Sequence, residues 1–414
     1  MSRQTRQASK LPRTPQHTNL NQAPYPWVRV TLAVLLAIAL FVGVAAALIL
    51  RNINNLAQNS VLATDHLQGP EIEEPIDSFE GRPVNILVVG IDSRYGDNGE
   101  LGAGTTDEFD TILSDANLLV HLSADRQSAT FMSVPRDLMV DIPECPRSNG
   151  TTTYAQFAQF NWSFSFGAGT DEDLAAGINC TELTLENLTD IDVDGFVLID
   201  FSGFSKLIDT LGGVEVCIDD YIIDPTTGLD LQAGCHELNG EMGLKFARVR
   251  KEINIETGRP RDGSDIARIG RQQQLLGAMV AQVLDSNMFT DLPKLYTFVQ
   301  EAMQTAGFSN SLGSWRTDAA LLNSMRNTPR DNIRFVTVPW EIYIYDTNRV
   351  APEEPLASEL FASIREDGPL PAGIIYKDLD GQSFLIGADG ESIPLDENGD
   401  PITPQSDDES TDNE

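Results

Sequence analysis

Basic residues are scarce in this chain of 414 residues, which has 28 Lys and Arg against 62 Asp and Glu and a net charge of −34. This acidic balance argues against non-specific nucleic-acid binding, so we expect no nucleic-acid partner. The sequence also lacks GxxxxGK[S/T], HExxH and GxSxG, the motifs of phosphate-binding loops, zinc proteases and many hydrolases. Any chemistry must therefore come from other residue patterns.

Charge is absent from Val30 to Leu50, a run of 21 residues that is long enough as a helix to cross a hydrocarbon core of ~30 Å. We predict a transmembrane helix over 30–50, preceded by a cytoplasmic tail over 1–29 and followed by an extracytoplasmic linker over 51–80. Bases precede the run and acids follow it, which places the N-terminus in the cytoplasm and the main domain outside the cell membrane. A cleaved signal peptide is the alternative, although its apolar region is normally shorter.

Cysteine is also rare, and no CxxC pair occurs, so the spacing does not favour a zinc ribbon or a thioredoxin-like site. Four cysteines in an extracytoplasmic domain favour two disulfides. We predict the pairs Cys145–Cys180 and Cys217–Cys235, because each pair brackets one polar loop. Four free buried thiols are the alternative.

Apolar runs that alternate with helical patterns over residues 81–350 predict one α/β domain, with a mixed central β-sheet flanked by helices in three layers. The predicted strands are Val84–Asp92, Asn117–Leu122, Ala129–Val134, Gly195–Phe201, Val214–Ile218, Ala247–Val249 and, as the last strand, Arg334–Val338. The predicted helices are Ser202–Leu211, Arg271–Leu284, Pro293–Gln304 and Asp318–Arg326. Residues 351–414 form a C-terminal extension that from about 366 becomes a solvated, acidic and disordered tail.

Charged residues stand at the ends of three of these strands. Asp92 and Arg94 follow the first strand, Asp115 precedes the second, and Arg136 follows the third. Open α/β sheets bind ligands beyond the carboxyl ends of their strands, so these side chains lie where a site is expected.

Arginine is concentrated between Phe246 and Gln274, where six arginines occur: Arg248, Arg250, Arg259, Arg261, Arg268 and Arg271. On a strand Arg248 and Arg250 face one side, and on a helix Arg268 and Arg271 do too. Guanidinium groups bind phosphate oxygens bidentately, and a diphosphate beside two carboxylates suits Mg²⁺ or Mn²⁺. Structural salt bridges with the many acids are the alternative.

The aromatic stretch Tyr154–Phe166 is open to two interpretations. It forms ordinary hydrophobic core, or it lines an apolar ligand groove in which Asn161 hydrogen-bonds a polar ligand group.

Five motifs occur in order over roughly residues 82–285: NILVVGIDSR, SDANLLVHLS, SVPRD, FARVR and SDIARIGRQQQLL. Together they closely resemble the LytR-CpsA-Psr family of wall-polymer transferases. The resemblance implies transfer of a glycopolymer from a polyprenyl-pyrophosphate carrier to a cell-envelope acceptor such as peptidoglycan. It also implies an apolar groove for the lipid tail, which favours a substrate-binding role for the stretch around Asn161.

By motif position, the resemblance implies that Asp92 and Asp115 hold Mg²⁺ or Mn²⁺ and, with Arg136, are catalytic. It further implies that the pyrophosphate is bound by a set of six arginines: Arg94, Arg136, Arg248, Arg250, Arg268 and Arg271.

The chain departs from the family at Leu113, where an arginine is common. Arg259 and Arg261 lie in a long segment and either form a mobile lid or replace that arginine. The alternative functions are hydrolysis of the polyprenyl-pyrophosphate carrier and non-catalytic binding of the carrier or of an anionic polymer.

Overall fold

A computed structural model describes the following residues: 81–92, 112–250, 253–254, 259–260, 265–285, 298, 301–312, 321, 324–325, 327–396 and 399–402. All of them belong to one structural unit, Ile53–Glu414. The transmembrane helix predicted at 30–50 lies outside the described residues. Among the helices that are described, none combines the length and apolar character needed to cross a membrane.

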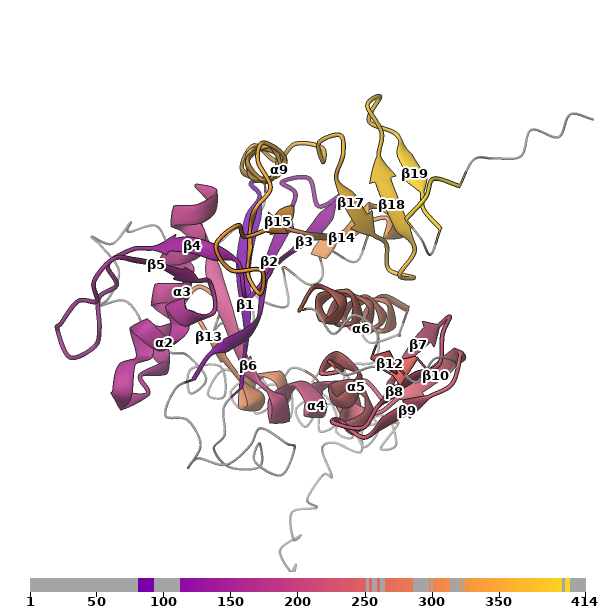
Figure 1. Ribbon diagram of the computed structural model, residues 1–414, viewed down its shortest axis with the longest axis horizontal. Coiled ribbons are helices and arrows are strands. Elements are labelled where there is room, and N and C mark those ends of the chain that lie inside the picture. The colour runs from indigo at the N-terminus through magenta and orange to yellow at the C-terminus, as the bar shows by residue number, and fades with distance from the viewer. Residues whose placement is uncertain are drawn as a thin grey trace, which may run out of the picture. The chain divides into compact units, whose positions relative to one another are not determined.

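A mixed nine-stranded sheet lies at the centre, in the order β13-β6-β1-β2-β3-β14-β17-β18-β19 (Figure 1). Strands β1, β2 and β3 are antiparallel neighbours, whereas β6 joins β1 and β14 joins β3 in parallel. The strands of this sheet are β1 (Val84–Ile91), β2 (Ser114–Leu122), β3 (Ala129–Val134), β6 (Gly195–Asp200), β13 (Ala306–Phe308), β14 (Ile333–Thr337), β17 (Ile375–Lys377), β18 (Ser383–Ile386) and β19 (Ser392–Pro394).

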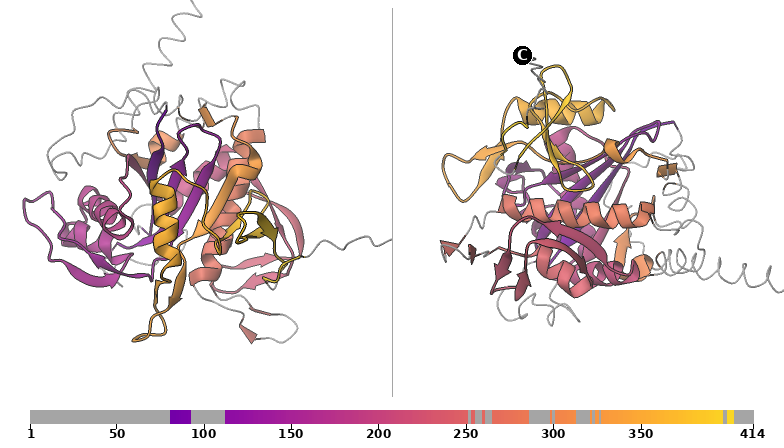
Figure 2. Two further views of the ribbon diagram at one scale, coloured as in Figure 1. Left: turned by 90° about the horizontal axis from the view of Figure 1, so that it is seen from above. Right: turned by 90° about the vertical axis from the view of Figure 1, so that its right-hand side faces the viewer.

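Helices cover both faces of the sheet, as predicted, and Figure 2 shows α9 and α6 on opposite sides of it. One face, with Leu87 and Met132, packs on Phe164 of α2, Ile178 of α3 and Leu360 of α9. The other face packs on α6. The helices are α2 (Trp162–Ala168), α3 (Leu174–Thr189), α4 (Phe201–Thr210), α5 (Gly240–Ala247), α6 (Asp265–Asp285) and α9 (Leu356–Arg365), with short 3-10 turns η3 (Gly169–Asp171) and η5 (Arg330–Asn332).

Five two-stranded antiparallel ribbons surround this framework. The ribbons are β4 (Met139–Ile142) with β5 (Gln156–Gln159), β7 (Val214–Ile218) with β10 (Gly234–Leu238), β8 (Ile222–Asp224) with β9 (Leu229–Leu231), β11 (Ile253–Asn254) with β12 (Arg259–Pro260), and β15 (Trp340–Ile342) with β16 (Val350–Pro352). The β7–β10 and β8–β9 ribbons share a separate apolar core with α5 and α6, in which Val214, Leu229, Phe246 and Leu275 are buried.

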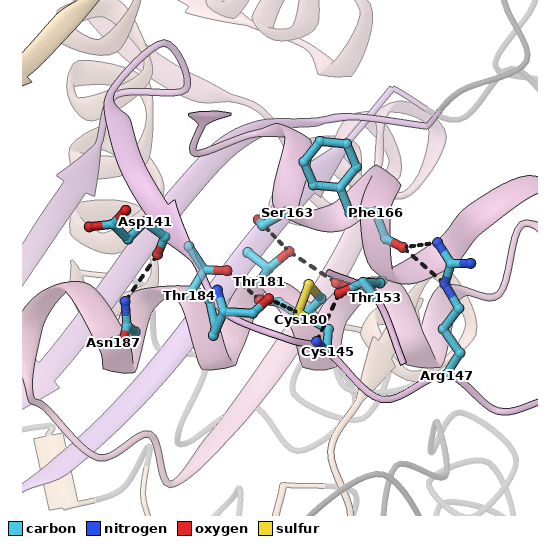
Figure 3. The surroundings of a disulfide bond; sticks show 12 residues. Asp141, Cys145, Arg147, Thr153, Ser163, Phe166, Cys180, Thr181, Thr184 and Asn187 are labelled. Carbon is cyan, nitrogen blue, oxygen red and sulfur yellow. Dashed lines mark hydrogen bonds between the residues drawn. A yellow bond between two sulfur atoms is a disulfide. The ribbon is translucent and has the colours of Figure 1, made fainter. Parts of the chain in front are cut away.

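Both predicted disulfides are present. Cys145–Cys180 joins the segment after β4 to α3 (Figure 3), and the Cys145 amide donates a hydrogen bond of 2.9 Å to the Thr153 hydroxyl. The Thr184 hydroxyl donates to the Cys180 carbonyl at 2.7 Å. Cys217–Cys235 crosses between the paired strands β7 and β10 at one register position. Each bridge therefore closes one of the bracketed loops.

The strand predicted at Ala247–Val249 is wrong. Residues up to Ala247 belong to α5, which begins after Asn239, whose side-chain oxygen accepts a hydrogen bond of 2.9 Å from the Met242 amide. Arg248 is the residue that ends the helix. The alternation of Arg248 and Arg250 suggested a strand, but the N-cap and the buried face of α5 decide the conformation.

The prediction that Arg334–Val338 is the last strand is also wrong. Strands β17, β18 and β19 follow β14 and extend the sheet, within a region predicted to be a solvated tail. Each has only three or four residues, too few for a period of two to stand out. Tight turns at Gly381 and Gly390, both with φ of +83°, join them. The predicted helices at 293–304 and 318–326 lie largely outside the described residues.

Candidate functional site

Asp92 and Asp115 meet at one edge of the sheet because of the register of β1 and β2. Ile91, the last residue of β1, pairs with Ser114, the first residue of β2. Asp92 follows directly, and its amide donates a hydrogen bond of 3.4 Å to the Leu113 carbonyl. The end of one antiparallel strand and the start of the next thus bring the backbones of the two predicted aspartates to the same edge of the sheet.

Arg136 reaches the same place from β3. Asn117 pairs with Val134 in the β2–β3 hairpin, so continuing the register two residues brings Arg136 opposite Asp115. The Arg136 Nη1 atom donates to Asp115 Oδ1 at 2.7 Å. The Asp137 carboxylate lies 3.7 Å from Arg136 Nε and contributes further negative charge next to this guanidinium.

Arg268 approaches Asp115 from α6 and is almost fully buried, with 3% of its surface exposed. Its Nη2 donates to the Asp115 carbonyl at 3.1 Å, and its Nη1 lies 3.9 Å from Asp115 Oδ1. Burial acts to raise the pKa of Asp115, but Arg268, Arg136 and Arg250 outweigh it, and the pKa lies below its ordinary value. Asp115 is therefore held as a carboxylate among cations.

The segment after α5 brings two further arginines to the cluster. The Arg248 guanidinium lies over the Phe201 ring, 4.4 Å from its centroid, at the junction of β6 and α4. Burial lowers the pKa of Arg248, whereas Asp92 and Asp115 act to raise it, so both carboxylates lie within electrostatic range of this side chain. The Arg250 side chain is exposed, and its Nη2 lies 3.9 Å from Asp115 Oδ1.

Arg271 and Asn161 touch the cluster through its backbone. Arg271 Nη2 donates to the Val249 carbonyl at 2.9 Å, and Val249 lies between the two arginines after α5. The backbone N–H of Asn161 donates a hydrogen bond of 3.1 Å to the Arg136 carbonyl. The Asn161 side chain is buried, and its Oδ1 accepts no hydrogen bond from the described residues.

The aromatic stretch Tyr154–Phe166 contributes in part to the core, and its role as a ligand groove stays a prediction. Phe160 and Phe164 are fully buried and belong to the core, whereas Phe157 and Trp162 are 51% and 43% exposed. The core interpretation therefore holds for two of the rings.

Several predicted positions lie outside the described part of the chain. Arg94 and Arg261 fall there, and of Arg259 only the backbone in β12 is described. Leu113 is half-buried immediately before β2. Arg259 and Arg261 thus remain open between a lid and a substitute for the arginine missing at Leu113.

The LytR_cpsA_psr family matches residues 53–361, which cover all the clustered carboxylates and arginines described above. The chain belongs to the LytR_cpsA_psr family. Its relatives include the cell wall biosynthesis protein LcpA of Corynebacterium glutamicum, 26% identical over 62% of this chain and 49% of LcpA. They also include the polyisoprenyl-teichoic acid–peptidoglycan teichoic acid transferases TagV and TagT of Bacillus subtilis. TagV is 26% identical over 67% of this chain and 63% of TagV. TagT is 28% identical over 61% of this chain and 69% of TagT. The match thus spans about half of LcpA and under two thirds of TagV.

Solved structures of LytR_cpsA_psr proteins share the fold. The crystal structure of B. subtilis TagV aligns with a TM-score of 0.51 and 21% identity, over 69% of this chain and 97% of that one. A structure of TagT bound to LI-WTA aligns with a TM-score of 0.51 and 20% identity, over 74% of this chain and 98% of that one. The mixed sheet flanked by helices is therefore the fold of this family.

Two residues that support this cluster were not predicted from the sequence. Asp224, fully buried at the end of β8, accepts a hydrogen bond of 2.9 Å from the Arg250 amide and fixes the arginine-bearing segment. Phe201 supports the guanidinium of Arg248. The position of Phe201 at a strand-to-helix junction next to Asp200 was a usable signal, whereas nothing in the sequence distinguishes Asp224 from the many other acids.

Proposed function

We propose that this chain is a phosphotransferase that moves a glycopolymer from a polyprenyl-pyrophosphate carrier to a cell-envelope acceptor such as peptidoglycan. The observation that carries the proposal is the convergence of Arg136, Arg250 and Arg268 on Asp115, with Arg248 in range of both carboxylates. Cations in this number around one partly exposed carboxylate are suited to a multiply charged anion such as a diphosphate. Family membership and the transferase names of relatives support the same reaction.

In the proposed reaction an acceptor hydroxyl attacks the phosphorus nearest the glycan. A bond forms between the acceptor oxygen and this phosphorus, the bond to the bridging oxygen breaks, polyprenyl phosphate leaves, and the hydroxyl proton passes to solvent water. Arg136 and Arg268 stabilise the negative charge on the phosphoryl oxygens as it moves to the leaving group. Arg248 and Arg250 bind the second phosphate, and Asn161 orients a polar group of the substrate.

Asp92 and Asp115 are the residues that would hold Mg²⁺ or Mn²⁺, which would neutralise charge on the pyrophosphate when bound. Because a metal ligand must be deprotonated, the lowered pKa of Asp115 suits this role. The described residues contain no group of three or more Asp, Glu, His or Cys side chains arranged for a metal. Two carboxylates supply only part of a coordination shell, so phosphate oxygens of the substrate would complete it.

We further propose that residues 30–50 anchor the chain in the cell membrane, with the N-terminus in the cytoplasm and the site outside. A lipid-linked donor is confined to the membrane, so an anchored enzyme meets it at high local concentration.

The test measures polyprenyl phosphate released from a pyrophosphate-linked glycan donor by the full chain in detergent, with Mg²⁺ and a peptidoglycan acceptor. Arg136→Ala should lower the rate about 100-fold, the size typical for loss of one charge-stabilising donor. Arg330→Ala is the matched control, because Arg330 is a surface residue paired with Asp285. An unchanged rate in both Arg136→Ala and Arg248→Ala would refute the assigned site.

Two results would support an alternative function in place of the transfer reaction. Release that does not depend on the acceptor would identify a carrier hydrolase. Tight binding of the donor with no product would identify a non-catalytic binding protein.

A further inference from the structure

A cavity of about 900 Å³ lies beside the arginine cluster, between α6, the end of β7 and the C-terminal strands. Its volume is within the range of small-molecule sites, roughly 300–1,000 Å³. Gly270 and Arg271 of α6 line it, and so does Lys377 of β17. The family match ends at residue 361, so the β17 wall comes from the segment that follows it.

The C-terminal segment lies close against α6 where this helix carries two glycines. Gly270 and Gly277 are seven residues apart, two helical turns, and so share a face. A Cβ atom at Gly277 would lie 3.1 Å from the Leu379 carbonyl oxygen, and one at Gly270 would lie 3.4 Å from Lys377 Nζ. The glycines thus bring the ammonium group of β17 directly onto the helix that carries the site arginines.

No acidic side chain in the described part of the protein pairs with Lys377. Burial and the nearby Arg271 both lower its pKa from the ordinary value. Within the described residues it forms no ion pair and no side-chain hydrogen bond. The ammonium group of Lys377 and the guanidinium of Arg271 line the same cavity and interact unfavourably with each other. An anion bound next to Lys377 would offset this repulsion, so the arrangement favours an anionic ligand.

The rest of the lining is suited to a sugar. Trp340 offers an aromatic surface, and the Thr337 and Ser383 hydroxyls offer hydrogen bonds. The carboxylates of Asp219, Asp220 and Glu353 also line the cavity, and none of the three is among the groups that shift the pKa of Lys377. Carboxylates in the lining can accept hydrogen bonds from the hydroxyl groups of a sugar.

We propose that this cavity binds an anionic saccharide unit of the glycopolymer, with its phosphate or carboxylate at Arg271 and Lys377 and its ring against Trp340. This inference rests on the proposed function, since Arg271 also contacts the segment that carries Arg248 and Arg250 through the Val249 carbonyl. A polymer whose pyrophosphate lies in the arginine cluster can extend into the cavity past Arg271. The C-terminal strands then select polymers that carry negative charge.

The experiment is calorimetric titration of the full chain in detergent with glucose 1-phosphate, glucuronic acid, glucose and inorganic phosphate. One or both anionic sugars should bind at least tenfold more tightly than glucose or phosphate, and the tighter of the two identifies the charged group. Lys377→Met should weaken that binding at least tenfold, and Lys206→Met, an exposed lysine of α4, should leave it unchanged. Absence of binding by both anionic sugars, or equal binding by Lys377→Met and the wild type, overturns the inference. Phosphate binding as tightly as the anionic sugars shows an anion site only and overturns the saccharide assignment.

Two further measurements keep the result clear. Lys377→Met removes a charge that the fold disfavours, so its melting temperature without ligand should equal or exceed that of the wild type. Trp340→Ala should weaken anionic sugars and leave phosphate unaffected, which tests the site with a second variant. Because binding is measured without transfer, a chain that binds sugar but releases no polyprenyl phosphate refutes the transfer reaction alone. An active chain that binds no anionic sugar refutes the cavity assignment alone.

Discussion

Glu182 makes the stability of the domain depend on pH in a predictable way. This residue lies within α3, is 7% exposed, and its Oε2 has no hydrogen-bond partner in the described part of the chain. Burial, and secondarily Glu186 one turn later, raise the pKa of Glu182 to about 8. The folded protein therefore keeps a proton at neutral pH that the unfolded chain releases.

The sign and size of the effect follow from this difference. The contribution of Glu182 to stability is greatest below pH 4.5, the ordinary pKa of a glutamate, falls as the pH rises toward about 8, and is constant above that value. At 1.36 kcal/mol for each pH unit, the folded state loses about 3 kcal/mol between pH 4.5 and pH 7 through this group. Glu182→Gln is neutral at every pH, so this loss should disappear in the variant.

The measurement is the difference in melting temperature between Glu182→Gln and the wild type at pH 5 and at pH 8. The difference should be small at pH 5 and should grow by several degrees at pH 8, at a few degrees for each kcal/mol. Subtracting the wild type at each pH removes the contribution of other titrating groups. Glu359→Gln, an exposed glutamate of α9, is the control and should give no such growth. If the melting-temperature difference between Glu182→Gln and the wild type is the same at pH 5 and at pH 8, the reasoning is refuted.

Three other predictions concern the site and its support. Arg268→Met should destabilise the domain by about 3 kcal/mol, because it leaves the largely buried Asp115 carboxylate with less compensating charge, and chemical denaturation measures the loss. Asp224→Asn should weaken donor binding more than it lowers the maximal rate, because it removes the carboxylate that fixes the Arg250 backbone; steady-state kinetics would show an unchanged KM if this contact is irrelevant. Cys180→Ser should cost about 2–5 kcal/mol of stability, and a variant as stable as the wild type under oxidising conditions would contradict the role of the bridge.

The central sheet, and the edge of it that carries Asp92 and Asp115, could be predicted because both depend on local sequence patterns. The apolar run Val84–Asp92 and the hairpin before Arg136 fix β1, β2 and β3, and an antiparallel register then places Asp92, Asp115 and Arg136 together. Both disulfides followed from the loops that they close. These features need only neighbouring segments, which a single sequence displays.

The remaining features depend on contacts between distant segments. The residue pair Arg248 and Arg250 has the spacing of a strand, but packing of Phe246 in the core beside α6 makes the preceding residues helical. The burial of Arg268 is set by where α6 crosses the sheet. Lys377 lies more than 100 residues after Arg271 in the sequence, and only the docking of β17 on β14 brings the two together. A strand as short as β17 has no hydrophobic period from which its neighbours in the fold could be predicted.

The pairing of β14 with β17 bears on how the protein should be divided for experiments. The family match stops at residue 361, which is a natural place to end a recombinant fragment. Such a fragment would leave the outer edge of β14 without the partner that pairs with Phe335 and Val336. An open strand edge next to apolar side chains recruits strands from other molecules, so the shortened protein should aggregate. A fragment that runs past Pro394 retains all three closing strands and should stay monodisperse in solution.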